Sequence, residues 1–217
     1  MASADVRVIA TGVDTSLFRP VEHATARASL GLPADRPLIL FVAADGLAAK
    51  RKGGHLVADI LMRLKQLMRP NEPAVLLLGT DTAPDLPLDT FVMGRLRDEA
   101  RMALIYAAAN VFVAPYLEDN LPNTVLEAIA CGTPVVAFDI GGTADVVRHG
   151  VNGFTVPSGD VGAMAASVAR LLMNGEERYT LGQKAREIAC AEFDLRRQAG
   201  AYCALLQELV NARRTRL

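Results

Sequence analysis

The chain has 217 residues, of which 51% are hydrophobic, and a formal net charge of −1. This length allows one substantial core, and the near-neutral charge argues against a nucleic-acid-binding protein. No apolar run approaches the roughly 20 residues that cross a bilayer, and the N-terminus lacks the basic and then apolar pattern of a secretory signal. We therefore expect a soluble, cytoplasmic protein.

The three cysteines, Cys131, Cys190 and Cys203, are odd in number and have no CxxC spacing. Disulfide frameworks and zinc sites need paired or closely spaced thiols. We therefore predict reduced, mostly buried thiols and no metal site. The three histidines are scattered, and no Ser or Cys nucleophile with a spaced His and acid stands out, which argues against a triad hydrolase.

Short β-rich runs alternate with helical patterns along the chain. We predict strands at residues 6–9, 38–43, 75–79, 90–93, 111–114, 135–138 and 154–156. Several of these runs are apolar at consecutive positions, as in strands that are buried on both faces. With helices between the strands, the pattern predicts an α/β fold with a doubly wound, mostly parallel, Rossmann-like sheet.

Helical periodicity marks residues 52–68, 99–109, 161–173 and 177–191, and a last helix at 194–213. In the first of these, Leu56, Ile60, Leu64 and Leu67 share one face. There is no internal repeat or convincing linker, so we predict a single domain over residues 1–217, with residues 194–217 as its C-terminal helical tail. Polar or basic segments at 43–54, 79–81 and 115–124 follow strands, and we expect them to converge on one rim of the sheet.

The most informative stretch is residues 115–134. The predicted strand before it leads into a loop with acidic residues. Pro122 suits the first turn of the following helix, because an N–H group there would have no hydrogen-bond partner within the helix. The amides around Asn123 and Thr124 would then be unpaired at a positive helix end. Such a helix start binds a phosphate without any basic side chain.

Asp119 and Glu127 stand eight positions apart, one in the loop and one within the helix, so they can flank a single ligand. Because carboxylates repel a phosphate, their expected partners are hydroxyl groups of a sugar or a ribose. Glu127 also interrupts an apolar helix face, where a lone carboxylate is costly unless it has a partner.

A second loop, residues 44–54, places Lys50, Arg51 and Lys52 before Gly53 and Gly54. Glycine lets backbone amides approach diphosphate oxygens, and the cations supply full charge. The alternative is that the three cations form an ordinary solvated charge run.

The segments 115–128, PYLEDNLPNTVLEA, and 131–136, CGTPVV, resemble the signature of the retaining, nucleotide-sugar-dependent glycosyltransferases of family 4, which have the two-lobed GT-B fold. That family has two glutamates separated by seven residues, whereas this chain has Asp119 and Glu127, and Glu118 competes for the first role. Residues 12–20 resemble the entry into the donor-binding lobe, and 194–213 the tail that crosses back to the other lobe. The resemblance implies a C-terminal donor-binding lobe, with the N-terminal acceptor lobe absent from this chain.

The resemblance further implies transfer of a hexose from a UDP- or GDP-sugar to a glycan or lipid-linked acceptor, with no metal or other cofactor required. It implies catalytic roles for Lys52, Asp119 and Glu127. It implies donor-binding roles for Lys52, Arg51, Gly53, Arg95, Asn120, Asn123, Thr124, Val125 and Glu127. Where the family has Gly-Arg, this chain has Ala43 and Ala44, so Arg51 or Lys50 substitutes for the arginine or the pyrophosphate is held more weakly.

Several alternatives stay open. Arg95 either stacks on a nucleobase or is an ordinary exposed arginine, and the loop at Gly141 and Gly142 either approaches the donor or is a simple turn. The whole chain could instead be a non-catalytic or degenerate nucleotide-sugar-binding module, or a lobe of another GT-B enzyme such as an epimerase or phosphorylase. If the acceptor lobe is missing, the isolated chain binds nucleotide weakly and transfers little. The arginines at 213, 214 and 216 favour peripheral association of the full enzyme with an anionic membrane.

Overall fold

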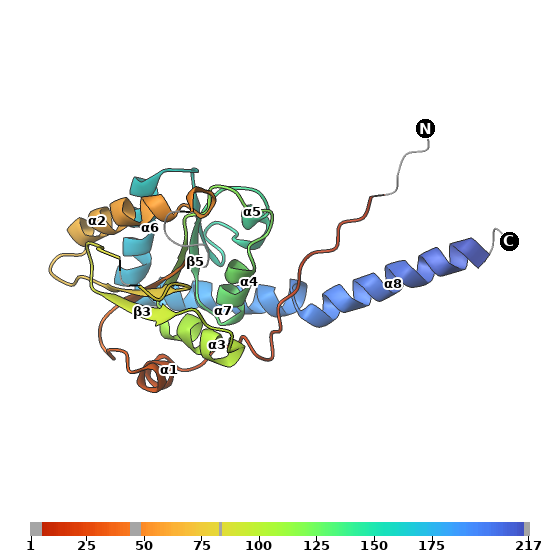
Figure 1. Ribbon diagram of the computed structural model, residues 1–217, viewed down its shortest axis with the longest axis horizontal. Coiled ribbons are helices and arrows are strands. Elements are labelled where there is room, and N and C mark those ends of the chain that lie inside the picture. Colours follow the sequence, from red (N-terminus) through yellow and green to blue (C-terminus); the bar gives the residue numbers. More distant parts are fainter. Residues whose placement is uncertain (1–5, 44–48, 83, 215–217) are drawn as a thin grey trace.

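Six parallel strands form the centre of the protein, in the order β3-β2-β1-β4-β5-β6 (Figure 1). The computed structural model describes residues 6–43, 49–82 and 84–214. The strands are β1 (Leu38–Val42), β2 (Ala74–Leu78), β3 (Thr90–Gly94), β4 (Val111–Ala114), β5 (Val135–Phe138) and β6 (Gly153–Val156). The prediction of a doubly wound parallel sheet is confirmed.

Consecutive side chains of the central strands enter two different cores. In β1, Leu38 and Leu40 pack into the core on one face of the sheet, whereas Ile39 and Phe41 pack into the core on the other. All four are at most 1% exposed. This explains why the strands are apolar at every position and not only at alternate ones.

Helices cover both faces of the sheet. Helices α2 and α6 pack together on one face, whereas α1, α3, α4 and part of α7 contribute to the core on the other (Figure 1). The helices are α1 (His23–Leu30), α2 (Val57–Leu67), α3 (Glu99–Ala108), α4 (Asn123–Ala130), α5 (Thr143–Val146), α6 (Val161–Met173), α7 (Gly175–Glu192) and α8 (Leu195–Arg214), with short 3-10 helices η1 (Lys50–Lys52) and η2 (Gly54–Leu56) before α2.

The strand order places a crevice between β1 and β4. The chain proceeds from β1 to β3 toward one edge of the sheet and then returns to β4, which pairs with the other side of β1. At such a reversal, the loops that follow the two strands diverge and leave a ligand site at the carboxyl ends of the strands. Those two loops contain Lys52 and Asp119, the residues that the sequence marks.

The strand predicted at residues 6–9 is wrong. These residues have no regular secondary structure, and Val6 and Val8 are 81% and 93% exposed. The segment leaves the body of the protein on the same side as α8 (Figure 1), and Arg7 pairs with Glu208 of that helix at 2.5 and 2.7 Å. A β-branched run without a neighbouring strand has no hydrogen-bonding partner, so its local propensity is not realised.

The helix predicted at 52–68 begins later. The left-handed Gly53 and the turn of η2 intervene, and α2 starts at Val57. Its buried face therefore consists of Val57, Ile60, Leu61 and Leu64, and Leu67 is 51% exposed. Ile60, Leu64 and Leu67 share a helical face as predicted, but Leu67 is the last residue of α2 and is exposed to solvent.

The prediction of mostly buried cysteines is also wrong. All three thiols are free, but only Cys131 is buried; Cys190 and Cys203 lie on exposed faces of α7 and α8. Among the helices in the described part of the chain, none is both long and apolar enough to cross a membrane.

Candidate functional site

The loop after β1 and the loop after β4 are bonded to each other. The carbonyl oxygen of Arg51 accepts hydrogen bonds from the amides of Leu117 at 2.9 Å and Glu118 at 3.1 Å. Gly53 lies against Pro115 with φ of +64°, and a Cβ atom at this position would stand 1.7 Å from the Pro115 carbonyl oxygen. Only glycine fits this contact, so Gly53 is required for the approach of the two loops.

Lys52 forms an ion pair with Asp119. Its Nζ lies 2.5 Å from Asp119 Oδ2 and 4.3 Å from the centre of the Tyr116 ring. Arg51 Nη1 lies 3.7 Å from the same oxygen. The side chains of Lys52 and Asp119 are only 23% and 12% exposed, so this pair is less screened by solvent than an ordinary surface pair. Lys52, which is predicted to bind the donor diphosphate, is thus in direct contact with Asp119, which is predicted to bind the donor sugar.

Helix α4 begins with unpaired amides, as expected. Pro122 is the residue just before the helix, with φ of −73° and ψ of 119°, and not in its first turn as predicted. The Pro122 carbonyl accepts from the amide of Val125 at 3.0 Å, and no acceptor in the described residues is bonded to the amides of Asn123 and Thr124. These two amides mark the positive end of the helix. Val125 offers neither a free amide nor an exposed side chain.

The partner that Glu127 needs is Tyr106 of α3. The Tyr106 hydroxyl donates a hydrogen bond of 2.7 Å to Glu127 Oε2, and the ring of Tyr106 is completely buried. Burial raises the pKa of the Glu127 carboxyl, and the hydrogen bond from Tyr106 opposes that rise. Burial, with the charge of Glu127, holds the pKa of Tyr106 well above its usual value. Tyr106 was not predicted from the sequence. The feature that could have identified it is a ring with a hydroxyl group inside an otherwise apolar run.

A cavity of about 300 Å³ opens beside Glu127 at the carboxyl ends of β1 and β2. Most of its lining is apolar, with a few polar side chains. The lining residues are Val42, Leu78, Gly79, Arg95, Leu96, Met102, Tyr106, Thr124 and Glu127. A mostly apolar cavity with a few polar groups is the usual form of a small-molecule site.

Arg95 reaches this cavity through a fixed backbone. The Arg95 amide donates to Asp81 Oδ1 at 3.0 Å, and its Nε lies 3.8 Å from Asp81 Oδ2. The side chain itself is 68% exposed. The structure therefore brings Arg95 to the cavity of Glu127 and Thr124, with its guanidinium at the mouth.

Lys52 and Asp119 do not line the cavity but adjoin it through Tyr116. The Tyr116 hydroxyl is 2.8 Å from Thr124 Oγ1, and the Tyr116 ring lies under Lys52. A chain of direct contacts thus links the ion pair, the start of α4 and the cavity. On the other side of α4, Glu127 also lines a cavity of about 260 Å³ together with Asn123.

The loop of Gly141 and Gly142 supports the acidic loop. A Cβ on Gly141 would stand 2.3 Å from the Asp119 carbonyl oxygen, and one on Gly142 would stand 2.0 Å from that of Asn120. The Gly142 amide donates to the Asn120 carbonyl at 2.8 Å. The loop after β5 therefore holds Asp119 and Asn120 in place. Ala44, where the family has arginine, lies outside the described residues.

Metal chemistry has no evident ligand set in this site. Within the described ranges, no group of three or more His, Cys, Asp or Glu side chains could hold a metal ion. Lys52 and Arg51 occupy the position beside Asp119 where a cation would otherwise balance the carboxylate. That the reaction requires no metal remains a prediction.

Known proteins share this architecture. The family described as Glycosyl transferases group 1 matches residues 36–174. A D-inositol 3-phosphate glycosyltransferase of Saccharomonospora viridis is 32% identical over 227 aligned residues, which cover 95% of this chain and 51% of that protein. The chain thus spans about half the length of the curated relatives that it matches.

Solved structures agree with the sequence relatives. Sucrose-phosphate synthase of Thermosynechococcus elongatus superposes with a TM-score of 0.81 at 30% identity, over 97% of this chain and 54% of that one. Anabaena HepE, solved in complex with UDP-glucose, superposes with a TM-score of 0.74 at 20% identity, over 93% of this chain and 57% of that one. These neighbours are GT-B glycosyltransferases, and the fold is the Rossmann-like lobe of that architecture. The chain belongs to the group 1 glycosyltransferases.

Proposed function

We propose that this chain is the donor-binding lobe of a retaining hexosyltransferase that uses a UDP- or GDP-sugar. The observation that carries the proposal is the position of Glu127. This carboxylate, held by Tyr106, stands between an apolar cavity and the unpaired amides of α4. A nucleotide has the matching sequence of groups: a flat base for the cavity, ribose hydroxyls for the carboxylate, and phosphates for the amides.

The proposed catalytic contribution is electrostatic. As the bond between the sugar and the diphosphate breaks, negative charge grows on the leaving diphosphate. The amides of Asn123 and Thr124, together with Lys52 and Arg51, are placed to stabilise this charge, without a metal or other cofactor. Donor binding would turn Lys52 from Asp119 toward phosphate oxygens and leave the Asp119 carboxylate to accept hydrogen bonds from sugar hydroxyls.

The comparisons support a nucleotide-sugar ligand. HepE was solved with UDP-glucose and with UDP, which are a hexose donor and its leaving group. Curated relatives such as that of Saccharomonospora viridis are D-inositol 3-phosphate glycosyltransferases. We propose the same class of donor for this chain, acting in the cytoplasm on a glycan or lipid-linked acceptor.

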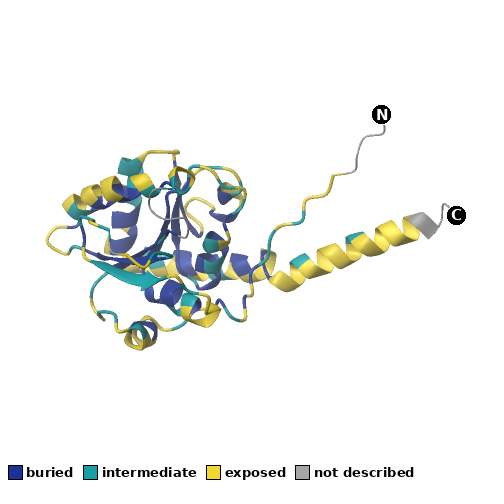
Figure 2. Cartoon of the chain, viewed as in Figure 1, coloured by how far each residue is buried: buried dark blue, intermediate teal, exposed yellow. Residues whose placement is uncertain are grey.

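We further propose that α8 packs against a second, acceptor-binding lobe. Helix α8 extends from the body of the protein and is exposed along nearly its whole length (Figure 2). Tyr202, Leu206, Leu209 and Val210 are each 47% to 60% exposed and fall on one stripe at helical spacing. An apolar stripe on a helix that leaves the domain is expected to be covered by another folded unit.

Calorimetric titration of the chain with UDP, GDP and their glucose and mannose conjugates tests the proposal. We expect weak but saturable binding, a preference for one base, and little or no sugar transfer to a soluble acceptor. Absence of saturable binding for every one of these nucleotides would contradict a donor site. Efficient transfer by the chain alone would contradict the requirement for a second lobe.

A second candidate function is a non-catalytic nucleotide-sugar-binding module. The observation that favours it is the Lys52–Asp119 ion pair, because in this arrangement both charges are already satisfied without a ligand. If Lys52→Ala and Glu127→Ala leave nucleotide binding unchanged, the donor site is vestigial and this second function holds.

A further inference from the structure

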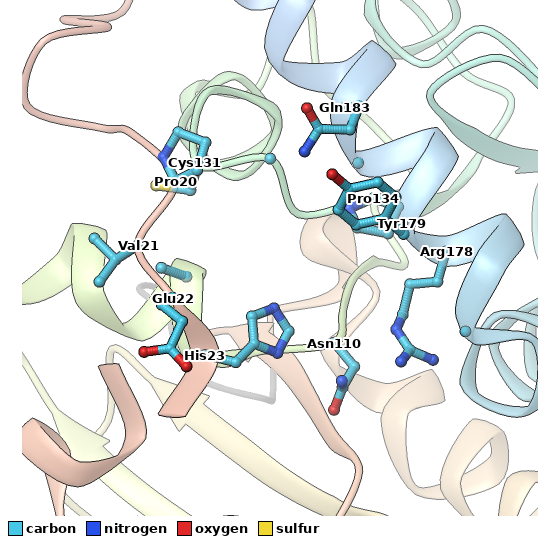
Figure 3. A pocket seen from close by; sticks show the side chains of 14 residues that line it. Pro20, Val21, Glu22, His23, Asn110, Cys131, Pro134, Arg178, Tyr179 and Gln183 are labelled. Carbon is cyan, nitrogen blue, oxygen red and sulfur yellow. The ribbon is translucent and has the colours of Figure 1, made fainter. Parts of the chain in front are cut away.

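A second cavity, with several polar side chains in its wall, lies at the opposite end of the strands, where they begin. It has a volume of about 480 Å³ and is bounded by α1, α7 and the residues just before β4 and β5 (Figure 3). Asn110 precedes β4, and Pro134 precedes β5. Because all strands are parallel, this cavity is separated from the candidate donor site by the length of the sheet.

Asn110 presents an unpaired side-chain amide donor to this cavity. The residue is 8% exposed, and its Oδ1 accepts hydrogen bonds from the Leu38 amide at 2.7 Å and from Arg27 Nη2 at 2.8 Å. Both partners are donors, so they fix which end of the side-chain amide is oxygen. Its Nδ2 therefore faces away from them, and within the described residues it has no hydrogen-bond acceptor. A side-chain amide donor that opens on a cavity without a protein acceptor is available to a ligand group.

Arg178 lies next to Asn110 in the cavity wall (Figure 3). Its Nη1 donates to the carbonyl oxygens of Leu171 at 2.8 Å and Leu172 at 3.2 Å, at the end of α6. These bonds hold the guanidinium in place and leave its other N–H groups without a partner in the described part of the chain. Burial lowers the pKa of Arg178.

His23 completes a positive side of the cavity. Partial burial, and after it the charges of Arg27 and Arg178, lower the pKa of His23, whereas Glu22 acts in the opposite direction. Among these groups the two arginines outweigh the single carboxylate. An anion in the cavity would relieve this repulsion, so its binding is expected to raise the pKa of His23.

We propose that this cavity binds the oxyanion group of a small metabolite, a phosphate monoester or a carboxylate. Asn110 Nδ2 and the free N–H groups of Arg178 would donate to the oxyanion, and protonated His23 would approach it from α1. Apolar walls of Pro20, Val21 and Pro134 would contact the carbon skeleton, and Glu22 would accept from a hydroxyl group. A planar guanidinium beside an amide donor is suited to two oxygens of one anion.

The test is NMR titration of the full chain with inorganic phosphate, acetate and glycerol 3-phosphate. We expect saturable shifts of the Asn110 side-chain amide and of His23, with a Kd on the order of 1 mM for phosphate and tighter binding of the organic anion. The pKa of His23 should rise in the presence of phosphate. A response to phosphate alone assigns a phosphoryl group, and a response also to acetate assigns the wider class of oxyanions.

Asn110→Asp is the decisive variant because it keeps the two accepted hydrogen bonds and replaces only the donor that faces the cavity. We expect it to weaken phosphate binding about tenfold or more. Asn211→Asp, on the exposed surface of α8, adds the same charge elsewhere and should have no effect. His23→Gln offers a second variant if Asn110→Asp perturbs the fold, and it should weaken binding at pH 6.

Two outcomes would overturn the proposal. One is the absence of saturable shifts at Asn110 and His23. Shifts confined to the amides of Asn123 and Thr124 would show binding at the donor site only and would also overturn the proposal. The other is equal phosphate affinity of the folded Asn110→Asp and Asn211→Asp chains. Neither depends on the proposed glycosyl transfer.

Discussion

The hydroxyl of Tyr106 donates a hydrogen bond of 2.7 Å to Glu127, and the two residues join α3 and α4 at the floor of the candidate nucleotide cavity. The carboxylate would be costly at this depth without that donor. Its second oxygen is left for a ligand, since in the described residues only Oε2 accepts a hydrogen bond from a side chain. Burial thus disfavours the charge of Glu127, while the geometry of the pair leaves the carboxylate suited to accept hydrogen bonds from ribose hydroxyls.

Glu127→Gln is expected to stabilise the protein and weaken nucleotide binding. Because burial raises the pKa of Glu127 above its ordinary value of 4.5, ionisation of this group costs folding free energy once the pH exceeds that value. The neutral variant should raise Tm at pH 7 by about 2–4 °C, the shift that ~1 kcal/mol produces in a domain of this size. Loss of the charged acceptor should weaken UDP binding about tenfold.

The pH dependence distinguishes this explanation from a general packing effect. The stability difference between the variant and the wild type should be greatest at neutral pH and disappear as the pH falls below 4.5, where Glu127 is protonated in both the folded and the unfolded chain. Thermal unfolding from pH 4 to pH 8 measures it. A difference that is independent of pH would contradict the role of the buried charge.

Tyr106→Phe is expected to raise the pKa of Glu127 further, since the hydrogen bond from Tyr106 is the influence that lowers it. The variant should lose about 1–2 kcal/mol of stability at pH 7, because it leaves a buried carboxylate without its donor. In the Glu127→Gln background the same substitution should cost less. A double-mutant cycle measured by urea denaturation gives the coupling, and additive effects would show that the hydrogen bond contributes nothing.

Gly53→Ala is expected to disrupt the contact between the two loops. The added Cβ would meet the Pro115 carbonyl at 1.7 Å and would also be placed at φ of +64°. Gly31→Ala is the matched control, because Gly31 has φ of +67° but nothing within 4 Å of the added atom. We expect about 1 kcal/mol of destabilisation for Gly31→Ala and about 1–3 kcal/mol more for Gly53→Ala, measured by urea denaturation. Equal losses would show that the loop contact adjusts freely.

Lys52→Met is expected to lower affinity for UDP about tenfold and to leave affinity for uridine unchanged, because only UDP carries the phosphates that this cation would bind. Lys50→Met, two residues earlier and exposed, is the control and should change neither. Asp119→Asn should have the opposite effect on UDP, because it removes the carboxylate that competes for Lys52. Calorimetry at fixed ionic strength measures all three, and equal losses for UDP and uridine would place Lys52 away from the phosphates.

The sequence predicts the sheet well because its strands are buried on both faces. Runs such as 111–114 and 135–138 are apolar at every position, and the structure has strands with those same bounds. The run at 6–9 has a similar local composition but no neighbouring strand, and sequence propensity cannot reveal that difference. The start of α2 was predicted too early for a local reason, since the left-handed Gly53 and the turn of η2 precede the helix.

Placement of the site residues on the rim of the sheet was predictable, but their partners were not. Motif spacing places Glu127 within a helix and indicates that it needs a partner, yet Tyr106 is 21 positions away and belongs to another helix. Similarly, the direct pairing of Lys52 with Asp119 depends on the Gly53–Pro115 contact, which joins segments from two loops. Contacts across loops follow from tertiary packing and leave no periodic trace in the sequence.

The most direct measurement for the donor site is an amide NMR titration of the full chain with UDP, with uridine as the comparison. We expect UDP to shift the backbone amides of Asn123 and Thr124 and the signals of Gly53 and Gly142, whereas uridine should shift mainly residues of the cavity beside Glu127. Saturable UDP binding that leaves the Asn123 and Thr124 amides unchanged would contradict a phosphate site at the start of α4.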